Sequence, residues 1–210
     1  MTPGRRARGR LVAVEGLDGS GKTAFSRALA DELGARWTTT PDATLRLVRD
    51  AVDDTWRSSP RARRLFYAAS VLACSDLCGP HLDAGETIVV DRYWASTVAY
   101  GELDDTADLL EPLGPLVRPA DATFYLELSE PIRRARLLGR GATRLDRASL
   151  EHHRALRESY RRALSAPAAG RVFMLDAGQP LTALVAHAAE LLARGPLGGA
   201  QTEFALSEQP

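Results

Sequence analysis

Lysine is nearly absent from this sequence. Of its 27 basic residues, 26 are arginine, and Lys22 is the single lysine among 210 residues. Asparagine is missing, and isoleucine occurs only twice. These three residues share AT-rich codons, so the bias is typical of a GC-rich genome that replaces lysine wherever arginine serves as well. Lys22 therefore marks a position with a particular chemical requirement.

Cysteine and long apolar runs are also scarce. Cys74 and Cys78 are too few for a disulfide framework or a four-cysteine zinc site, and we expect free thiols in a reducing compartment. The apolar run at residues 11–14, behind a basic N-terminus, is too short for a signal peptide. No run approaches the roughly 18 apolar residues of a membrane span. We expect a cytoplasmic protein without a membrane partner.

Charge of one sign is not in excess. The 27 basic and 27 acidic residues balance, which argues against nucleic-acid binding driven by net charge. A chain of 210 residues with 45% hydrophobic residues is long enough for one α/β domain but not for two. We expect a flexible basic N-terminus at residues 1–9, one domain at residues 10–193 and a loose tail at residues 194–210.

Short apolar runs alternate with longer stretches of helical periodicity. The runs predict strands at residues 11–15, 36–40, 87–90, 122–128 and 171–175. The periodic stretches predict helices at residues 23–33, 45–52, 61–84, 149–166 and 181–192, the third broken at Gly79-Pro80. This alternation indicates an α/β fold with a five-stranded parallel sheet and helices on both faces.

The most specific motif begins where the first strand ends. Residues 16–23, Gly-Leu-Asp-Gly-Ser-Gly-Lys-Thr, match the pattern GxxxxGK[ST] in full. The glycines let backbone N–H groups turn inward, and the following helix adds its positive dipole end, so the loop predicts an anion cradle. Lys22 should reach the β and γ phosphates, where a planar guanidinium fits poorly. The residues expected to bind ATP are Gly16, Asp18, Gly19, Ser20, Gly21, Lys22 and Thr23.

A second polar pair, Asp91-Arg92, follows the strand at residues 87–90. Strand ends in an open parallel sheet face the ligand crevice, so Asp91 can hold Mg²⁺ beside the phosphates together with the Thr23 hydroxyl. We therefore expect ATP and Mg²⁺ to bind here. Considered alone, Asp91-Arg92 is equally compatible with an ordinary ion pair in a loop.

Together these motifs resemble those of thymidylate kinases. Residues 91–100, Asp-Arg-Tyr-Trp-Ala-Ser-Thr-Val-Ala-Tyr, fit the family pattern DRYxxSxxAY, and the resemblance extends over residues 10–192. It implies a P-loop kinase fold with a mobile lid, here at about residues 133–148. It also implies ATP-dependent phosphoryl transfer to dTMP or a dTMP-like pyrimidine nucleotide, and a homodimer packed through a long helix such as residues 61–84.

The resemblance further implies roles for individual side chains. Arg92 would grip the acceptor phosphate, and Arg140, Arg144 and Arg147 would belong to the lid. Because the loop residue after Asp18 is a glycine, the lid would supply the catalytic arginine. The implied catalytic residues are Lys22, Asp18, Arg92, Arg140 and Arg144, and the implied acceptor-binding residues are Asp18, Tyr67 as the base-stacking ring, Val71, Arg92, Thr97 and Tyr100.

Two acceptor-side arginines of the family pattern are missing. Val71 stands where the family usually has an arginine near the thymine, and Thr39-Thr40-Pro41 lacks the arginine that usually precedes the proline. In so arginine-rich a chain, composition does not explain these losses. The acceptor therefore stays open among dTMP, a modified pyrimidine nucleotide and, as an alternative, a nucleoside or a specialised-metabolite phosphate. A third hypothesis is a degenerate kinase that binds nucleotide as a regulatory protein.

Overall fold

A single parallel sheet organises the computed structural model, which describes residues 8–194 and 202–203. Its strand order is β2-β3-β1-β4-β5-β6, and all neighbouring strands are parallel. The five predicted strands are confirmed to within one residue at each end, and a two-residue strand joins the edge. The bounds are β1 Leu11–Gly16, β2 Arg36–Thr39, β3 Ile88–Asp91, β4 Ala122–Glu127, β5 Arg171–Asp176 and β6 Thr202–Glu203.

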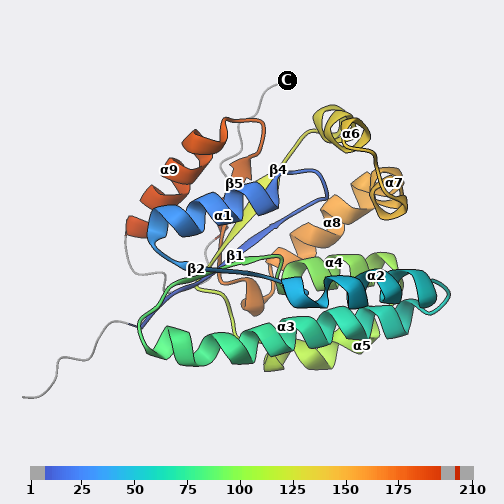
Figure 1. Cartoon of the computed structure of the whole chain (residues 1–210), viewed down its shortest axis with the longest axis horizontal. Helices are drawn as coiled ribbons and strands as arrows, with labels where there is room; N and C mark the ends of the chain where they lie inside the picture. The colour runs from blue at the N-terminus through green and yellow to red at the C-terminus, as the bar shows by residue number, and fades with distance from the viewer. Residues whose placement is uncertain (1–7, 195–201, 204–210) are drawn as a thin grey trace, which may run out of the picture.

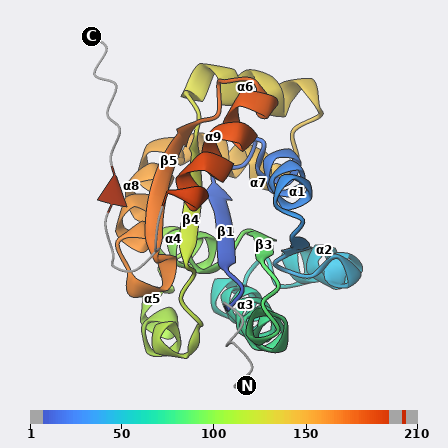
Figure 2. The same ribbon diagram turned by 90° about the vertical axis from the view of Figure 1, so that its left-hand side faces the viewer.

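Helices cover both faces of the sheet (Figures 1 and 2). Apolar side chains of α1 and α9 pack on one face, while α3, α4 and α8 pack on the other. The central strand β1 is buried along its whole length, as its apolar run predicts. The bounds are α1 Lys22–Leu33, α2 Arg46–Thr55, α3 Pro60–Asp83, α4 Trp94–Leu103, α5 Ala107–Leu110, α6 Glu130–Gly139, α7 Arg144–Glu151, α8 His153–Leu164 and α9 Leu181–Ala193.

Two helix predictions were wrong in detail. The predicted break at Gly79-Pro80 does not occur: α3 continues through Pro80 to Asp83, although the proline removes one backbone hydrogen bond from this last turn. The helix predicted at residues 149–166 is two helices, α7 and α8, which meet at His152. The earlier start of α7 comes from a capping box in which Thr143 and Asp146 satisfy each other's backbone N–H groups.

The sheet topology places both sequence motifs at one crevice. The chain leaves β1 toward β2 and leaves β3 in the opposite direction toward β4, so β1 and β3 flank a topological switch point where α/β folds bind ligands. The phosphate loop follows β1, and Asp91-Arg92 ends β3 beside it, with the Arg92 N–H donating to the Val14 carbonyl at 2.9 Å. Helices α6 and α7 lie above these strand ends (Figure 2).

The structure describes only part of the predicted N-terminal and C-terminal segments. Most of the predicted N-terminal segment 1–9 and C-terminal tail 194–210 lies outside the described residues, although Gly9 donates its N–H to the Leu82 carbonyl at 2.8 Å. Within the described residues, none of the helices combines the length and apolarity needed to span a bilayer.

Candidate active site

The loop between β1 and α1 has the backbone shape of an anion cradle. Gly19 and Gly21 have φ values of +86° and +92°, in the left-handed region that favours glycine. A Cβ on Gly19 would come within 2.9 Å of Leu137 on α6, so a side chain is excluded here by packing as well. Gly21 precedes α1 and no side chain caps the helix, which leaves its first N–H groups for a ligand.

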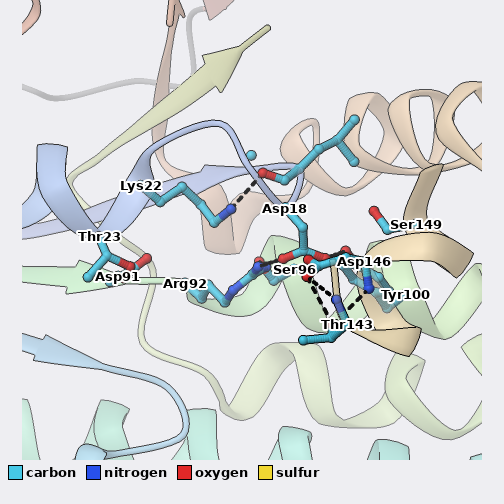
Figure 3. A network of polar contacts seen from close by, with 12 residues as sticks. Asp18, Lys22, Thr23, Asp91, Arg92, Ser96, Tyr100, Thr143, Asp146 and Ser149 are labelled. Atoms are coloured by element: carbon cyan, nitrogen blue, oxygen red, sulfur yellow. Dashed lines mark hydrogen bonds and ion pairs between the residues drawn. The ribbon is translucent and has the colours of Figure 1, made fainter. Parts of the chain in front are cut away.

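Lys22 lies inside this loop. Its ammonium donates to the Leu17 carbonyl at 2.7 Å, and the residue is only 5% exposed (Figure 3). Burial and the positive charge of Arg92 lower the pKa of Lys22 to about 7, against the partial opposition of the Asp18, Asp91 and Glu15 carboxylates. The site therefore holds a cation that lacks a full counter-charge, which a polyphosphate would supply.

This depressed pKa predicts proton uptake when nucleotide binds. At pH 8 a group with a pKa of about 7 is mostly neutral, and an adjacent polyphosphate restores the ammonium form by raising that pKa. The ATP phosphates are already ionised at this pH. Titration calorimetry at pH 8 in buffers of different ionisation enthalpy should show net proton uptake for the wild type and none for Lys22→Met. Buffer-independent enthalpies for both proteins would contradict this prediction.

Thr23 and Asp91 meet at the predicted metal position. The Thr23 hydroxyl donates to Oδ2 of Asp91 at 2.6 Å, while Oδ1 of the same carboxylate is buried without a hydrogen-bond partner. A buried carboxylate oxygen beside a hydroxyl fits a hard cation such as Mg²⁺, which takes few protein ligands and several from phosphate and water. Among the described residues there is no cluster of three or more His, Cys, Asp or Glu side chains that could hold a metal without phosphate.

Arg92, Asp18 and Tyr100 form a second group at the crevice. The Arg92 guanidinium pairs with one oxygen of Asp18, and the Tyr100 hydroxyl donates to the other at 2.6 Å. Burial would raise the pKa of Asp18, but the charges of Arg92 and Lys22 outweigh it and hold that pKa well below its usual range. The carboxylate is therefore ionised at neutral pH and aligns the guanidinium.

The backbone at Arg92 is strained. Its φ of +67° is unusual for a residue with a side chain. Thr40 holds this conformation by donating its hydroxyl to the Arg92 carbonyl at 2.8 Å, and Thr39 donates to the Asp91 carbonyl at 3.1 Å. The segment that lacks the family's arginine thus braces the turn that aims Arg92 at the crevice.

A fully buried carboxylate, Glu15, supports this turn from behind. One of its oxygens accepts from the Tyr93 and Ser96 N–H groups at 2.9 and 3.1 Å, and the other contacts the Ser96 hydroxyl. Tyr93 is the N-cap of α4 and Ser96 its third residue, so the side chain of Glu15, on strand β1, caps the N-terminus of this helix. This capping role was not predicted from sequence, although the charge of Glu15 at the end of a buried strand is a signal that the side chain has a polar partner.

Arginines of α6 cover the phosphate loop. Arg133 is completely buried and donates to the Asp18 carbonyl at 3.3 Å and to Ser149 of α7 at 2.7 and 3.0 Å. Arg136 and the predicted Arg140 both line a cavity of about 290 Å³. The other residues around this cavity are Asp18, Gly19, Gly21, Lys22, Thr23, Ala24 and Arg92. Arg133 and Arg136 were missed individually because all positions in an arginine-rich stretch look alike in sequence.

The remaining predicted residues lie farther from this cavity. Arg144 points toward α2, where it donates to the Asp53 carbonyl at 3.3 Å, and Tyr67 donates to the Asp53 carboxylate. Thr97 is buried on α4. Val71 is 1% exposed and packs in the apolar core with Leu11, Ala13, Val90, Tyr93 and Trp94, on the face of α3 that rests on the sheet, so its contact with the acceptor stays a prediction.

Together the fold and this site define a P-loop kinase, with a phosphate cradle after β1, an acid and an arginine after β3 and arginines above both. The family model for thymidylate kinase matches residues 14–188, so the chain belongs to the thymidylate kinase family. This confirms the resemblance carried by the two motifs.

Individual relatives agree with this assignment. The chain is 36% identical over 205 residues to a thymidylate kinase of Roseiflexus sp. (strain RS-1), covering 83% of this chain and 89% of that protein. It is 32% identical over 197 residues to a probable thymidylate kinase of Natronomonas pharaonis, covering 86% and 95%. A solved thymidylate kinase of Candida albicans has the same fold, with a TM-score of 0.69 at 20% identity over 89% of this chain and 92% of that one.

Proposed function

We propose that this enzyme transfers the γ-phosphoryl group of ATP to dTMP. One cavity carries the proposal, because it brings donor-side groups, Lys22 and Thr23, together with acceptor-side groups, Asp18 and Arg92. In the reaction, the bond between the γ-phosphorus and the bridging oxygen of ATP breaks, and a bond forms to a phosphate oxygen of dTMP. Four cations, Lys22, Arg92, Arg136 and Arg140, line the space where charge shifts during this transfer.

Each side chain has a proposed part in this step. Lys22 and the N–H groups of the loop hold the ATP phosphates, and Arg92 grips the acceptor phosphate through its bidentate fork. Asp18 keeps Arg92 aligned until the acceptor arrives. Arg140 is the proposed lid arginine that neutralises the transferring group, while the lid excludes water. Thr23 and Asp91 would hold Mg²⁺, which would neutralise the charge of the donor phosphates.

The comparisons support dTMP over the alternative acceptors. The matched family and the relatives described above are thymidylate kinases. The two motifs also contact each other at the crevice, through the Arg92–Asp18 and Thr23–Asp91 pairs. The missing arginine before Pro41 is compatible with this function because Thr39 and Thr40 instead hold the Asp91-Arg92 turn.

A substrate panel tests the proposed function. The full-length protein is incubated with ATP and Mg²⁺ and with dTMP, dUMP, a 5-substituted dUMP, UMP, dCMP or thymidine, and ADP and diphosphate products are quantified by chromatography. We expect turnover with dTMP and none when the metal is chelated. Turnover of thymidine alone would instead indicate a nucleoside kinase, and ATP binding without turnover of any acceptor would support the regulatory hypothesis.

An apolar ridge on α3 supports the proposal that the enzyme is a homodimer. Leu65, Ala69, Ala73 and Leu77 follow one another at intervals of four residues, and all four are exposed, Leu77 to 73%. Such i, i+4 ridges interlock when two helices pack. A second copy of the chain that presents the same ridge would cover both faces in an isologous interface.

Charge on this ridge should separate the subunits. We expect light scattering after size exclusion to give about twice the chain mass of 22.7 kDa for the wild type and the single mass for Leu77→Arg. A buried guanidinium in an apolar interface has no partner there, which is a severe penalty. Leu116→Arg, at a residue 64% exposed outside α3, is the matched control and should leave the mass unchanged. A wild-type protein of single mass at micromolar concentration would refute the dimer.

A further inference from the structure

A buried carboxylate on α2 lies outside the cavity that holds the phosphate-binding groups. Asp53 is 8% exposed, and its two oxygens lie 3.0 and 2.9 Å from the Tyr67 hydroxyl on α3. Burial raises the pKa of Tyr67, which keeps the phenol protonated, and its hydroxyl donates to the Asp53 carboxyl group. The contact fixes the outer end of the ring.

The position of Asp53 is unfavourable for α2 itself. The residue lies in the last turn of this helix, Arg46–Thr55, where the helix dipole disfavours negative charge. Asp54 shares that position, but it is exposed and lies 3.5 Å from Arg57 of the following turn. The Asp53 carboxylate instead accepts a hydrogen bond from Tyr67 on α3. Because the Asp53 carboxylate disfavours the end of its own helix but holds Tyr67, its presence is better explained by a role in the active site than by the stability of α2.

The backbone of the same residue contacts the lid. Arg144, the first residue of α7, donates to the Asp53 carbonyl at 3.3 Å. This carbonyl is among the last four of α2, which have no partner within a helix. Through Arg144, the lid segment therefore contacts Asp53, the residue that also holds Tyr67.

Further contacts lead from Tyr67 to the phosphate loop. The Arg64 guanidinium lies 5.7 Å from the Tyr67 ring centroid and 5.9 Å from that of Tyr100, so it contacts both rings. Arg64 is 5% exposed and is anchored by Asp104 at 2.7 Å. Since Tyr100 donates to Asp18, the contacts are continuous from Arg144 of the lid to the carboxylate that aligns Arg92.

We propose that Asp53 is a positioning residue that links acceptor binding to lid closure. Its carboxylate holds Tyr67 at the acceptor side, and its carbonyl receives Arg144 when the lid closes. This inference rests on the proposed function, because the acceptor that Tyr67 meets is the nucleoside monophosphate. Arg144 then contributes to acceptor affinity rather than to the transfer of the phosphoryl group.

Steady-state kinetics with dTMP and ATP tests the carboxylate. Asp53→Ala should raise the KM for dTMP about tenfold, as expected for loss of a hydrogen bond to a charged group, with the KM for ATP within twofold of the wild type. Asp53→Asn should restore the dTMP KM because its amide oxygen still accepts from Tyr67. Tyr67→Phe should match Asp53→Ala, and the double variant should be no worse than either. Asp54→Ala, which removes the same charge from the same turn, is the matched control and should behave as the wild type.

Arg144→Ala tests the lid contact. It should raise the KM for dTMP about fivefold with kcat nearly unchanged, whereas Arg134→Ala, at an exposed arginine of α6, should change neither. A dTMP KM for Asp53→Ala equal to that of Asp54→Ala would overturn the proposal, as would additive effects of Asp53→Ala and Tyr67→Phe or a kcat loss alone in Arg144→Ala. If the wild type were inactive with every monophosphate, the proposed function itself would be refuted. The variant results above bear only on the role of Asp53.

Discussion

Lys22→Arg is expected to lower kcat at least about a hundredfold, although it preserves the positive charge and agrees with the composition of the chain. The ammonium is 5% exposed and its only described hydrogen bond runs to the Leu17 carbonyl of its own loop. A guanidinium is larger and planar, so it cannot occupy that space and direct a single donor at the β and γ phosphates. The loop would open, and the fixed donors would lose their alignment. The change is measured by steady-state kinetics with ATP and dTMP.

Two controls make this result interpretable. Arg36→Lys exchanges the same residue types in the other direction at an exposed ion pair with Glu86 and should leave kcat within twofold. The melting temperature of Lys22→Arg should stay near that of the wild type, which would show that the loss is catalytic. If Lys22→Arg kept more than a tenth of wild-type kcat, catalysis would not require an ammonium at position 22, and the single lysine would need another explanation.

The strands and the phosphate loop were predictable because their signals are local. A strand buried on both faces needs a continuous apolar run, and β1, β3 and β4 each contain such a run. The glycines of the loop are required by its own backbone angles. Helix ends were less predictable, because the capping box at Thr143 and Asp146 outweighed the apolar period that placed the helix start at residue 149.

The parts of the site that sequence reasoning missed depend on distant contacts. The charge of Glu15 in a buried strand indicates that it has a partner, but not that the partners are N–H groups 78 and 81 residues away. The Asp53–Tyr67 hydrogen bond likewise joins two helices whose relative packing is not encoded locally. The burial of Val71 was unpredictable for a related reason, because the face of a long helix that meets the sheet is decided by the tertiary fold.

Glu15→Ala is expected to have the largest effect on stability, a loss of about 3 kcal/mol in the free energy of unfolding. It leaves the N–H groups of Tyr93 and Ser96 buried without an acceptor, and each such orphan costs about 1–3 kcal/mol. It also frees the residue after Arg92, whose φ of +67° needs support from both sides. Catalysis should therefore fall together with stability. Denaturant unfolding and dTMP kinetics on the same preparation measure both effects.

The charge of Glu15 matters less than its shape, and this distinguishes capping from ion pairing. Burial raises the pKa of Glu15 above its ordinary value, against the opposing hydrogen bonds from Ser96 and Tyr93, so the stability that this residue contributes falls as the pH rises above 4.5 toward the folded pKa. Glu15→Gln resembles the neutral acid: its oxygen accepts both N–H groups and its amide donates to Ser96. It should be as stable as the wild type at pH 7. Glu127→Ala, which removes a half-exposed carboxylate paired with Arg157, should cost less than about 1 kcal/mol. If Glu15→Gln were instead as unstable as Glu15→Ala, the negative charge itself would support the Arg92 turn.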